Sequence, residues 1–169
     1  GITVIAYAAV TVPNTFSSGT TISSAQVNAN FTALGNAMPA VKTATAGSTA
    51  LTTSYSDIIT LSITPVTDGY VYVQANGYAC LYTVTTTKWL NIGISETSAV
   101  APSSSNRTAY QIDGVIGGGN HCAPYSVNAV FPVTGGVLKN IYLVGNESAA
   151  DGILMDNRLT ALFIPSLQP

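Results

Sequence analysis

The segment YSVNAVFPV, residues 125–133, carries an apolar side chain at every second position. A period of two residues is that of a β-strand with one face in a core. After the opening tyrosine, the apolar members of the alternation are Val127, Ala129, Phe131 and Val133. The segment therefore predicts a half-buried strand.

Runs of the same kind fill the chain from about residue 44 to its end, separated by clusters of Gly, Pro, Asn and Ser. The longest, YVYVQANGYACLYTV (residues 70–84), contains Gly77, which predicts a bulge or a bend. About eight short strands with turn signals between them are typical of a β-sandwich. We therefore expect a mainly β chain, most simply a jelly-roll β-sandwich of about eight strands.

The last run, RLTALFIP (residues 158–165), is apolar on both faces. Alternation assigns three of its side chains to one face: Leu159, Ala161 and Phe163. Leu162 and Ile164 then point to the opposite face. Such a strand needs cover on both sides, so one face meets the core and the other needs a neighbour. A symmetric oligomer would supply that neighbour, which makes Leu162 and Ile164 candidate interface residues.

Residues 19–38, GTTISSAQVNANFTALGNAM, predict one short α-helix. Ser23 and Gln26 have the spacing of a capping box, and Gly35 and Pro39 limit the far end. A helix of about 14 residues is too short to be stable alone in water. Its apolar side chains form one narrow seam: Val27, Phe31, Leu34 and Met38. The seam fits packing on symmetry mates or on another protein, and packing on the chain's own domain is the open alternative.

The organisation of the chain follows from these elements. Residues 1–12 are apolar and rich in β-branched side chains, which favours an extended arm over a secretory signal. Residues 1–40 would form an arm and helix for anchoring or oligomerisation, and residues 41–169 a β-sandwich head. No apolar run approaches the roughly 20 residues that cross a bilayer, so we expect no membrane insertion.

Charged residues make up 7% of the 169 positions, against about 25% in a typical soluble domain. The net charge of −2 offers no basic field for phosphates, so we expect no nucleic-acid partner. So few charges protect a monomer poorly against association. The composition indicates a subunit whose surface is largely covered by copies of itself or by a larger particle.

Residues with catalytic or metal-binding chemistry are scarce. His121 is the single histidine, and its neighbour Cys122 gives no zinc-site spacing. No serine lies in a G-x-S-x-G motif. We expect no enzyme, no metal site and no cofactor, and the loop at residues 146–151 fits a solvated loop better than a calcium site. Cys80 and Cys122 are expected as buried free thiols, with a disulfide as the alternative.

Aromatic residues could provide stacking platforms for a sugar. Trp89 lies mid-strand beside Leu90, which favours a core position. Tyr110, His121 and Tyr125 lie near strand ends or loops and form the candidate ligand surface. Small polar loops on a rigid sandwich suit recognition. Three loops would carry the contact: residues 97–107, 117–121 and 146–152.

Residues 16–34, FSSGTTISSAQVNANFTAL, resemble a segment near the start of bacteriophage fibre, spike and tail-associated proteins. In that segment a Gly-Thr turn leads to a short helix with Gln-Val-Asn-x-Asn-Phe and then a Leu. The matching positions are Gly19, Thr20, Gln26, Val27, Asn28, Asn30, Phe31 and Leu34. Three later stretches, ITPVTDGYVYVQANGY, VFPVTGGVLKNIYL and LTALFIP, resemble trimeric jelly-roll heads of the tumour-necrosis-factor and complement type.

The resemblance implies a non-enzymatic structural protein of a bacteriophage virion, assembled in the host cytoplasm. It implies a homotrimer, with the terminal strand from Leu159 to Ile164 near the threefold axis, built as a spike, a fibre or a capsid decoration protein. Residues 1–40 would contact other virion proteins. A receptor- or glycan-binding module for host attachment is the alternative, and the position on the particle stays open.

Overall fold

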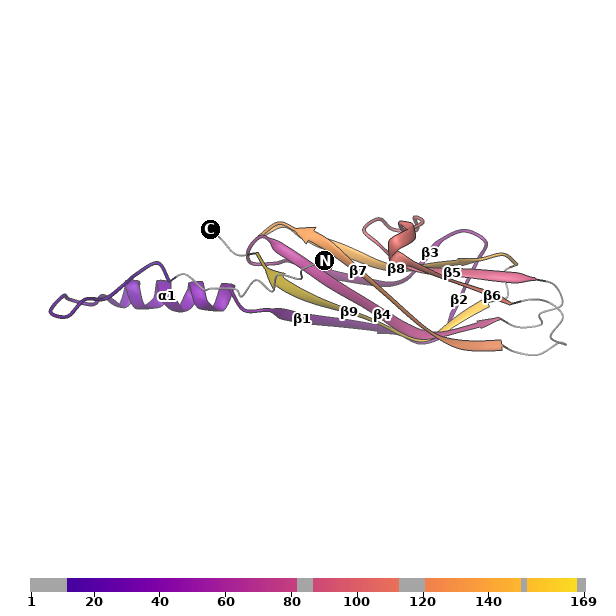
Figure 1. Cartoon of the computed structure of the whole chain (residues 1–169), viewed down its shortest axis with the longest axis horizontal. Coiled ribbons are helices and arrows are strands. Elements are labelled where there is room, and N and C mark those ends of the chain that lie inside the picture. The colour runs from indigo at the N-terminus through magenta and orange to yellow at the C-terminus, as the bar shows by residue number, and fades with distance from the viewer. Residues whose placement is uncertain (1–11, 82–86, 113–120, 150–151, 167–169) are drawn as a thin grey trace, which may run out of the picture.

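The computed structural model describes residues 12–81, 87–112, 121–149 and 152–166. It is a β-sandwich with one α-helix that projects from one end, along the long axis of the molecule (Figure 1). The described part has nine strands, of which one is two residues long. The expected fold class, a mainly β sandwich with about eight strands and one short helix, is confirmed.

The elements follow one another without long gaps. In chain order they are α1 (Ser24–Asn36), β1 (Ala40–Ala46), β2 (Thr49–Ala50), β3 (Ser56–Ile63), β4 (Gly69–Leu81), β5 (Lys88–Ser95), the 3₁₀ turn η1 (Ser104–Asn106), β6 (Arg107–Ile112), β7 (His121–Val133), β8 (Lys139–Glu147) and β9 (Gly152–Pro165).

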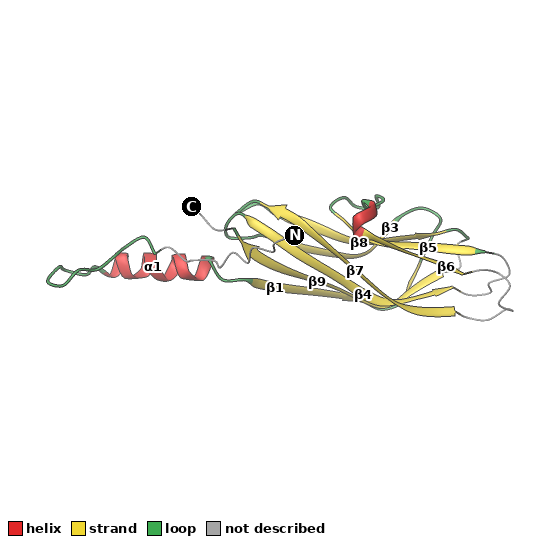
Figure 2. Cartoon of the chain, in the orientation of Figure 1, coloured by secondary structure: helices red, strands yellow, loops and turns green. Residues whose placement is uncertain are grey.

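The strands form two antiparallel sheets. One has the order β1-β9-β4-β7, with β2 also paired to β9, and the other has the order β3-β8-β5-β6. The chain crosses repeatedly between the sheets, so that most hydrogen-bonded neighbours are distant in sequence (Figure 2). This order is that of a jelly roll, as the sequence predicts.

The core lies between the two sheets and follows the alternation along the strands. In β7, every second side chain from Tyr125 to Val133 is buried. In β9, Leu159, Ala161 and Phe163 are buried, whereas Leu162 is half-buried and Ile164 is 45% exposed. The expectation that β9 is apolar on both faces is therefore confirmed.

The bulge predicted at Gly77 is present, although the extra residue belongs to the neighbouring strand. Asp156 and Asn157 of β9 together lie opposite Gly77 of β4, and Asp156 has a φ of 52°. A Cβ atom at Gly77 would lie 2.8 Å from the carbonyl oxygen of Met155. Glycine is thus required because the strands approach closely beside the bulge.

The helix begins as the sequence predicts. Ser23 is the N-cap: its Oγ accepts from the Gln26 backbone N–H at 3.2 Å, and the Gln26 side chain accepts from the Ser23 N–H at 3.2 Å. These two bonds complete a capping box. None of the residues of α1 is buried. The helix is therefore capped locally but not covered by the sandwich.

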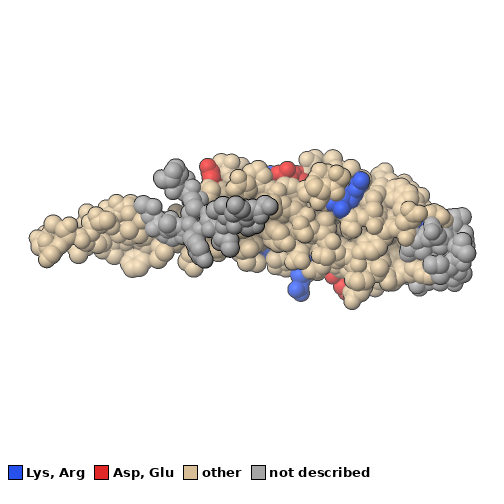
Figure 3. Space-filling view, in the orientation of Figure 1, with Lys and Arg blue, Asp and Glu red and all other residues tan. Residues whose placement is uncertain are grey.

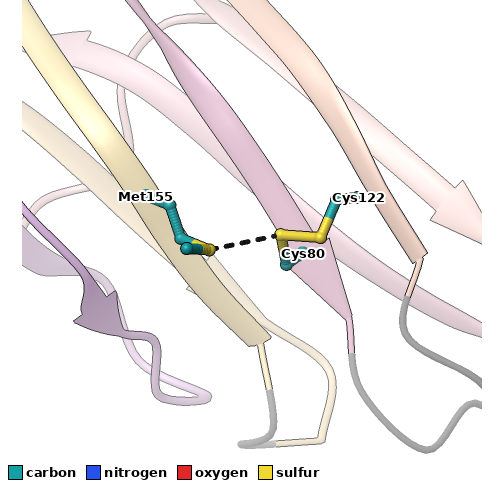
Figure 4. The surroundings of a disulfide bond; sticks show 3 residues. All are labelled: Cys80, Cys122 and Met155. Carbon is teal, nitrogen blue, oxygen red and sulfur yellow. Dashed lines mark hydrogen bonds between the residues drawn. A yellow bond between two sulfur atoms is a disulfide. The ribbon is translucent and has the colours of Figure 1, made fainter.

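Cys80 and Cys122 form a disulfide between β4 and β7, which corrects the expectation of two free thiols (Figure 4). The two residues are direct partners in the strand register, with Cα atoms 4.0 Å apart. The sequence separates them by 42 positions, so their proximity follows from strand pairing alone. Met155 of β9 lies beside the bond, with its sulfur 3.7 Å from the Cys80 sulfur.

The disulfide should contribute strongly to stability, because it closes a long loop in the unfolded chain. For a separation of 42 residues the loss on removal should be about 4 kcal/mol. Urea unfolding of the oxidised chain and of a Cys80→Ser/Cys122→Ser variant would measure it. A reducing agent should destabilise the parent chain and leave the variant unchanged. Two titratable thiols in the folded oxidised protein would contradict the pairing.

Candidate interaction surfaces

The helix seam, defined by Val27, Phe31, Leu34 and Met38, is largely open to solvent. Phe31 is 66% exposed, Leu34 is 47% exposed and Met38 is 62% exposed, while Val27 is half-buried. Exposed apolar side chains of this size are unfavourable in water unless a partner covers them. The structure thus brings Val27, Phe31 and Leu34 together on α1, whereas Met38 follows the end of the helix, and the sandwich buries none of the four.

Residues 12–16 pack along α1 and make one side of a small groove. Asn14 and Asn30 fix this segment: the Asn14 N–H donates to Asn30 Oδ1 at 2.9 Å, and Asn30 Nδ2 donates to the Asn14 carbonyl at 2.8 Å. Val12 and Phe16 then line a groove of about 250 Å³ with seam residues Val27, Phe31 and Leu34. This pairing cannot be predicted from the sequence, because asparagine residues give no indication of the partners of their side chains.

A second apolar surface lies on the outer face of the β1-β9-β4-β7 sheet. In the strand register, Tyr70 lies between Pro132 and Ile164, and Tyr72 lies between Val130 and Leu162. Val41 extends the second row, opposite Leu162. We call this surface the apolar band, and its members are Val41, Tyr70, Tyr72, Val130, Pro132, Leu162 and Ile164.

The apolar band is confined to the end of the sheet near α1. The next row on the same face is polar, with Gln74 between Asn128 and Thr160. In the space-filling view most of the visible surface carries neither acidic nor basic side chains (Figure 3). The band is therefore a local feature of a nearly uncharged surface.

A groove lies between the end of the helix and the sandwich, close to both the helix seam and the apolar band. It encloses about 470 Å³ between the end of α1 and the edge of the sandwich. Met38 of the seam and Val41 of the band both line it, together with Val66 and Lys42. One residue of the seam and one of the band therefore lie on the same groove at the base of the helix.

The predicted ligand surface is not assembled on the outside of the molecule. Tyr125 is 3% exposed, and its hydroxyl donates to Asn157 Oδ1 at 2.7 Å. Tyr110 packs against the core, and its hydroxyl donates to the carbonyl of Pro124 in the opposite sheet. His121 is half-buried, and its Nε2 has no hydrogen-bond partner in the described part of the chain. Tyr125 is therefore a core residue, which corrects its nomination for ligand contact.

Of the predicted loops, residues 97–107 are well defined and contain η1, whereas residues 117–120 lie outside the described part. Asn146 and Glu147 are buried residues of β8 rather than loop residues. Glu147 Oε2 accepts from the Gly152 N–H at 2.6 Å. The expected solvated loop is therefore shorter than the sequence predicts.

Several acidic side chains of the described residues accept hydrogen bonds from backbone N–H groups. Asp57 accepts from the Ala99 N–H at 2.7 Å, and Asp68 accepts from the Gly135 N–H at 2.8 Å. Within the described ranges no three His, Cys, Asp or Glu side chains come together as metal ligands would. No helix there has the length and apolar character to cross a membrane.

Trp89 is 40% exposed on the outer face of the four-stranded sheet, which corrects its assignment to the core. Its neighbours Lys88 and Leu90 point inward instead, at 7% and 1% exposed. Leu90 fixes this alternation, because a strand that buries Leu90 must turn Trp89 outward. Burial of the lysine beside an exposed tryptophan reverses the usual preference of both residues.

Burial raises the pKa of the Tyr125 phenol well above 10, and the nearby Tyr110 adds to this effect. In the unfolded chain the same phenol ionises near pH 10. Stability should therefore fall by about 1.4 kcal/mol per pH unit above about pH 10, because only the unfolded chain loses the proton. Tyr125→Phe should show a shallower fall. Urea unfolding between about pH 9 and pH 11 measures it, with Tyr78→Phe on an exposed ring as the matched control that keeps the parent slope.

No protein-family model matches the chain, and no curated protein sequence matches it. Its fold is similar to that in a structure of the Gx strain of infectious bursal disease virus, with 18% identity, a TM-score of 0.41 and coverage of 75% of this chain and 32% of that chain. A VP2 subviral particle of the same virus gives 18% identity, a TM-score of 0.40 and coverage of 75% and 33%. The mosquito-larvicidal Cry4Aa toxin from Bacillus thuringiensis gives 14% identity, a TM-score of 0.31 and coverage of 69% and 19%. The chain spans about a third of the viral chains, and similarities of this size assign neither family nor function.

Proposed function

We propose that the chain is a non-enzymatic structural protein of a bacteriophage virion, exposed on the particle as a homotrimeric spike, fibre or capsid decoration protein. Residues 1–40 attach it to other virion proteins, and residues 41–169 form the outward head. The observation that carries the proposal is the apolar band, which lies close to the open helix seam at one end of a nearly uncharged molecule.

The apolar band supports self-association. Tyr70 is 53% exposed and Val130 is 58% exposed, so the isolated chain leaves much of this surface in water. Covering a large apolar side chain contributes about 1.5–3 kcal/mol relative to full exposure. The band contains no charged side chain that would have to be desolvated in an interface. In a closed symmetric trimer every copy presents the same surfaces, so the band of each copy can be covered by its two neighbours.

The helix seam supports a second, separate contact. Because α1 lies beyond the end of the sandwich, contact through the band leaves most of the seam available (Figure 1). A short amphipathic helix that fits a groove on another protein is a common recognition mode. The resemblance of residues 16–34 to the start of phage fibre and spike proteins agrees with attachment to a particle through this element.

The oligomer is tested by placing a carboxylate in the band. Tyr72→Glu and Leu162→Glu should each convert the trimer to monomer, because a charge in a covered apolar patch is strongly unfavourable. Native mass spectrometry at micromolar concentration measures the change. Gln74→Glu in the adjacent polar row is the control and should remain trimeric. A parent chain that is a stable monomer under these conditions would contradict the proposal.

The anchoring function is tested on the seam. Phe31→Ser with Leu34→Ser should leave the thermal unfolding of the head unchanged, since neither side chain is buried in it. The same variant should fail to join purified particles in a reconstitution assay. Thr32→Ser on the exposed side of α1 should join them like the parent chain. Incorporation of the seam variant at the parental level would show that residues 1–40 are not the anchor.

A further inference from the structure

Trp89 stands apart from the other exposed apolar residues. It is the single tryptophan of the chain, and no other large apolar side chain described on the strands of the β3-β8-β5-β6 sheet is exposed. Ser148 holds the backbone of Trp89 through two hydrogen bonds. The Trp89 N–H donates to Ser148 Oγ at 3.1 Å, and the Ser148 N–H donates to the Trp89 carbonyl at 3.0 Å. The indole therefore sits on a rigid strand and not on a loose loop.

The side chains around the indole are amides. Gln111 lies directly opposite Trp89 on β6, and Asn91 follows two residues later on the same face of β5. Asn91 Nδ2 donates to Asn146 Oδ1 at 3.1 Å, and Asn146 Nδ2 donates to the carbonyl of Thr53 at 3.2 Å. This chain of bonds fixes the carboxamides of Asn91 and Asn146, of which Asn146 is buried.

Beside Trp89, the outer face of the sheet is uncovered at Ala109 and covered by a loop at Gly93. Ala109, opposite Asn91, is exposed and too small to cover the strand. One row further on, the loop before β6 lies on Gly93: a Cβ there would fall 2.3 Å from Pro102 Cγ. Asp57 ties the same loop to β3 by accepting from the Ser98 hydroxyl at 2.5 Å. Strands β5 and β6 therefore form an uncovered surface beside Trp89, and the loop before β6 borders this surface on one side.

The geometry points to a saccharide-binding site at Trp89, with Asn91, Ala109 and Gln111 as its floor. A pyranose ring has an apolar face of C–H groups that stacks on an aromatic ring, and hydroxyls that pair with amide donors and acceptors. A protein partner fits this surface poorly, because a dry contact over the indole would desolvate the amides around it. The apolar band on the other sheet shows the contrasting composition, with aromatic rings and no amides in its rows.

The local sequence supports a binding role. A strand that exposes its tryptophan and buries the preceding lysine departs from the pattern that would stabilise the fold best. Such departures are expected where a residue serves binding. A saccharide site at Trp89 would serve attachment to a host surface, the alternative function indicated by the sequence, and it does not require the trimer.

The experiment uses the chain of 169 residues on a printed array of bacterial and animal cell-surface oligosaccharides. Solution titration with the strongest array binder follows, with the emission of Trp89 as a built-in probe because the chain has no other tryptophan. We expect a saturable change in that emission. Calorimetry should show that Trp89→Ala weakens binding by about tenfold or more. Ala109→Gln, which fills the open floor, should weaken it as well.

Tyr78→Ala, an exposed aromatic residue of the other sheet, is the matched control and should bind like the parent chain. Far-UV circular dichroism and native mass spectrometry of each variant check that fold and oligomeric state are kept. The inference is overturned if no saccharide binds, or if Trp89→Ala binds like the parent chain. A loss of trimer with retained sugar binding would instead count against the proposed assembly alone.

Discussion

The position of β9 between β1 and β4, with apolar side chains on both of its faces, is the constraint on which the rest of the structure depends. The strand is hydrogen-bonded to β1 and β2 on one side and to β4 on the other. Its inward side chains, Leu159, Ala161 and Phe163, close the core. Its outward side chains, Leu162 and Ile164, complete both rows of the apolar band. The same alternation that fills the interior therefore also creates the surface offered to a neighbour.

The two sheets of the sandwich differ in what they offer outside. The outer face of one sheet is apolar near α1 and polar beyond it. The outer face of the other sheet carries the exposed Trp89 with Asn91 and Gln111 as register neighbours, and it is partly covered by the loop before β6. Since the sheets face away from each other, assembly through the first face leaves the second in solvent. A rigid sandwich can thus hold two unlike contacts without a change of conformation.

The features that could be predicted from the sequence are those set by near neighbours in the chain. Alternation in β7 and β9, the capping box of Ser23 and Gln26, and the bulge at Gly77 depend on residues a few positions apart. The disulfide and the environments of Trp89 and Tyr125 were assigned incorrectly because they depend on which strands pair and in which register. For Trp89, the sequence contains two opposing indications. Burial of Leu90 requires Trp89 to face outward, but the charged Lys88 lies on the same face as Leu90 and suggests that this face is exposed.

The stability of the molecule depends on whether the disulfide between Cys80 and Cys122 has formed. In a reducing compartment such as a bacterial cytoplasm, Cys80 and Cys122 would remain thiols, and strands β4 and β7 would be joined by their hydrogen bonds alone. Oxidation after release into an aerobic medium would then form the disulfide at the end of the sheet remote from α1. The strands would not have to move, because Cys80 and Cys122 are already partners in the register. Newly made and aged molecules would share one fold and differ in durability. Maturation of this kind requires no protease and no partner, only exposure to the outside.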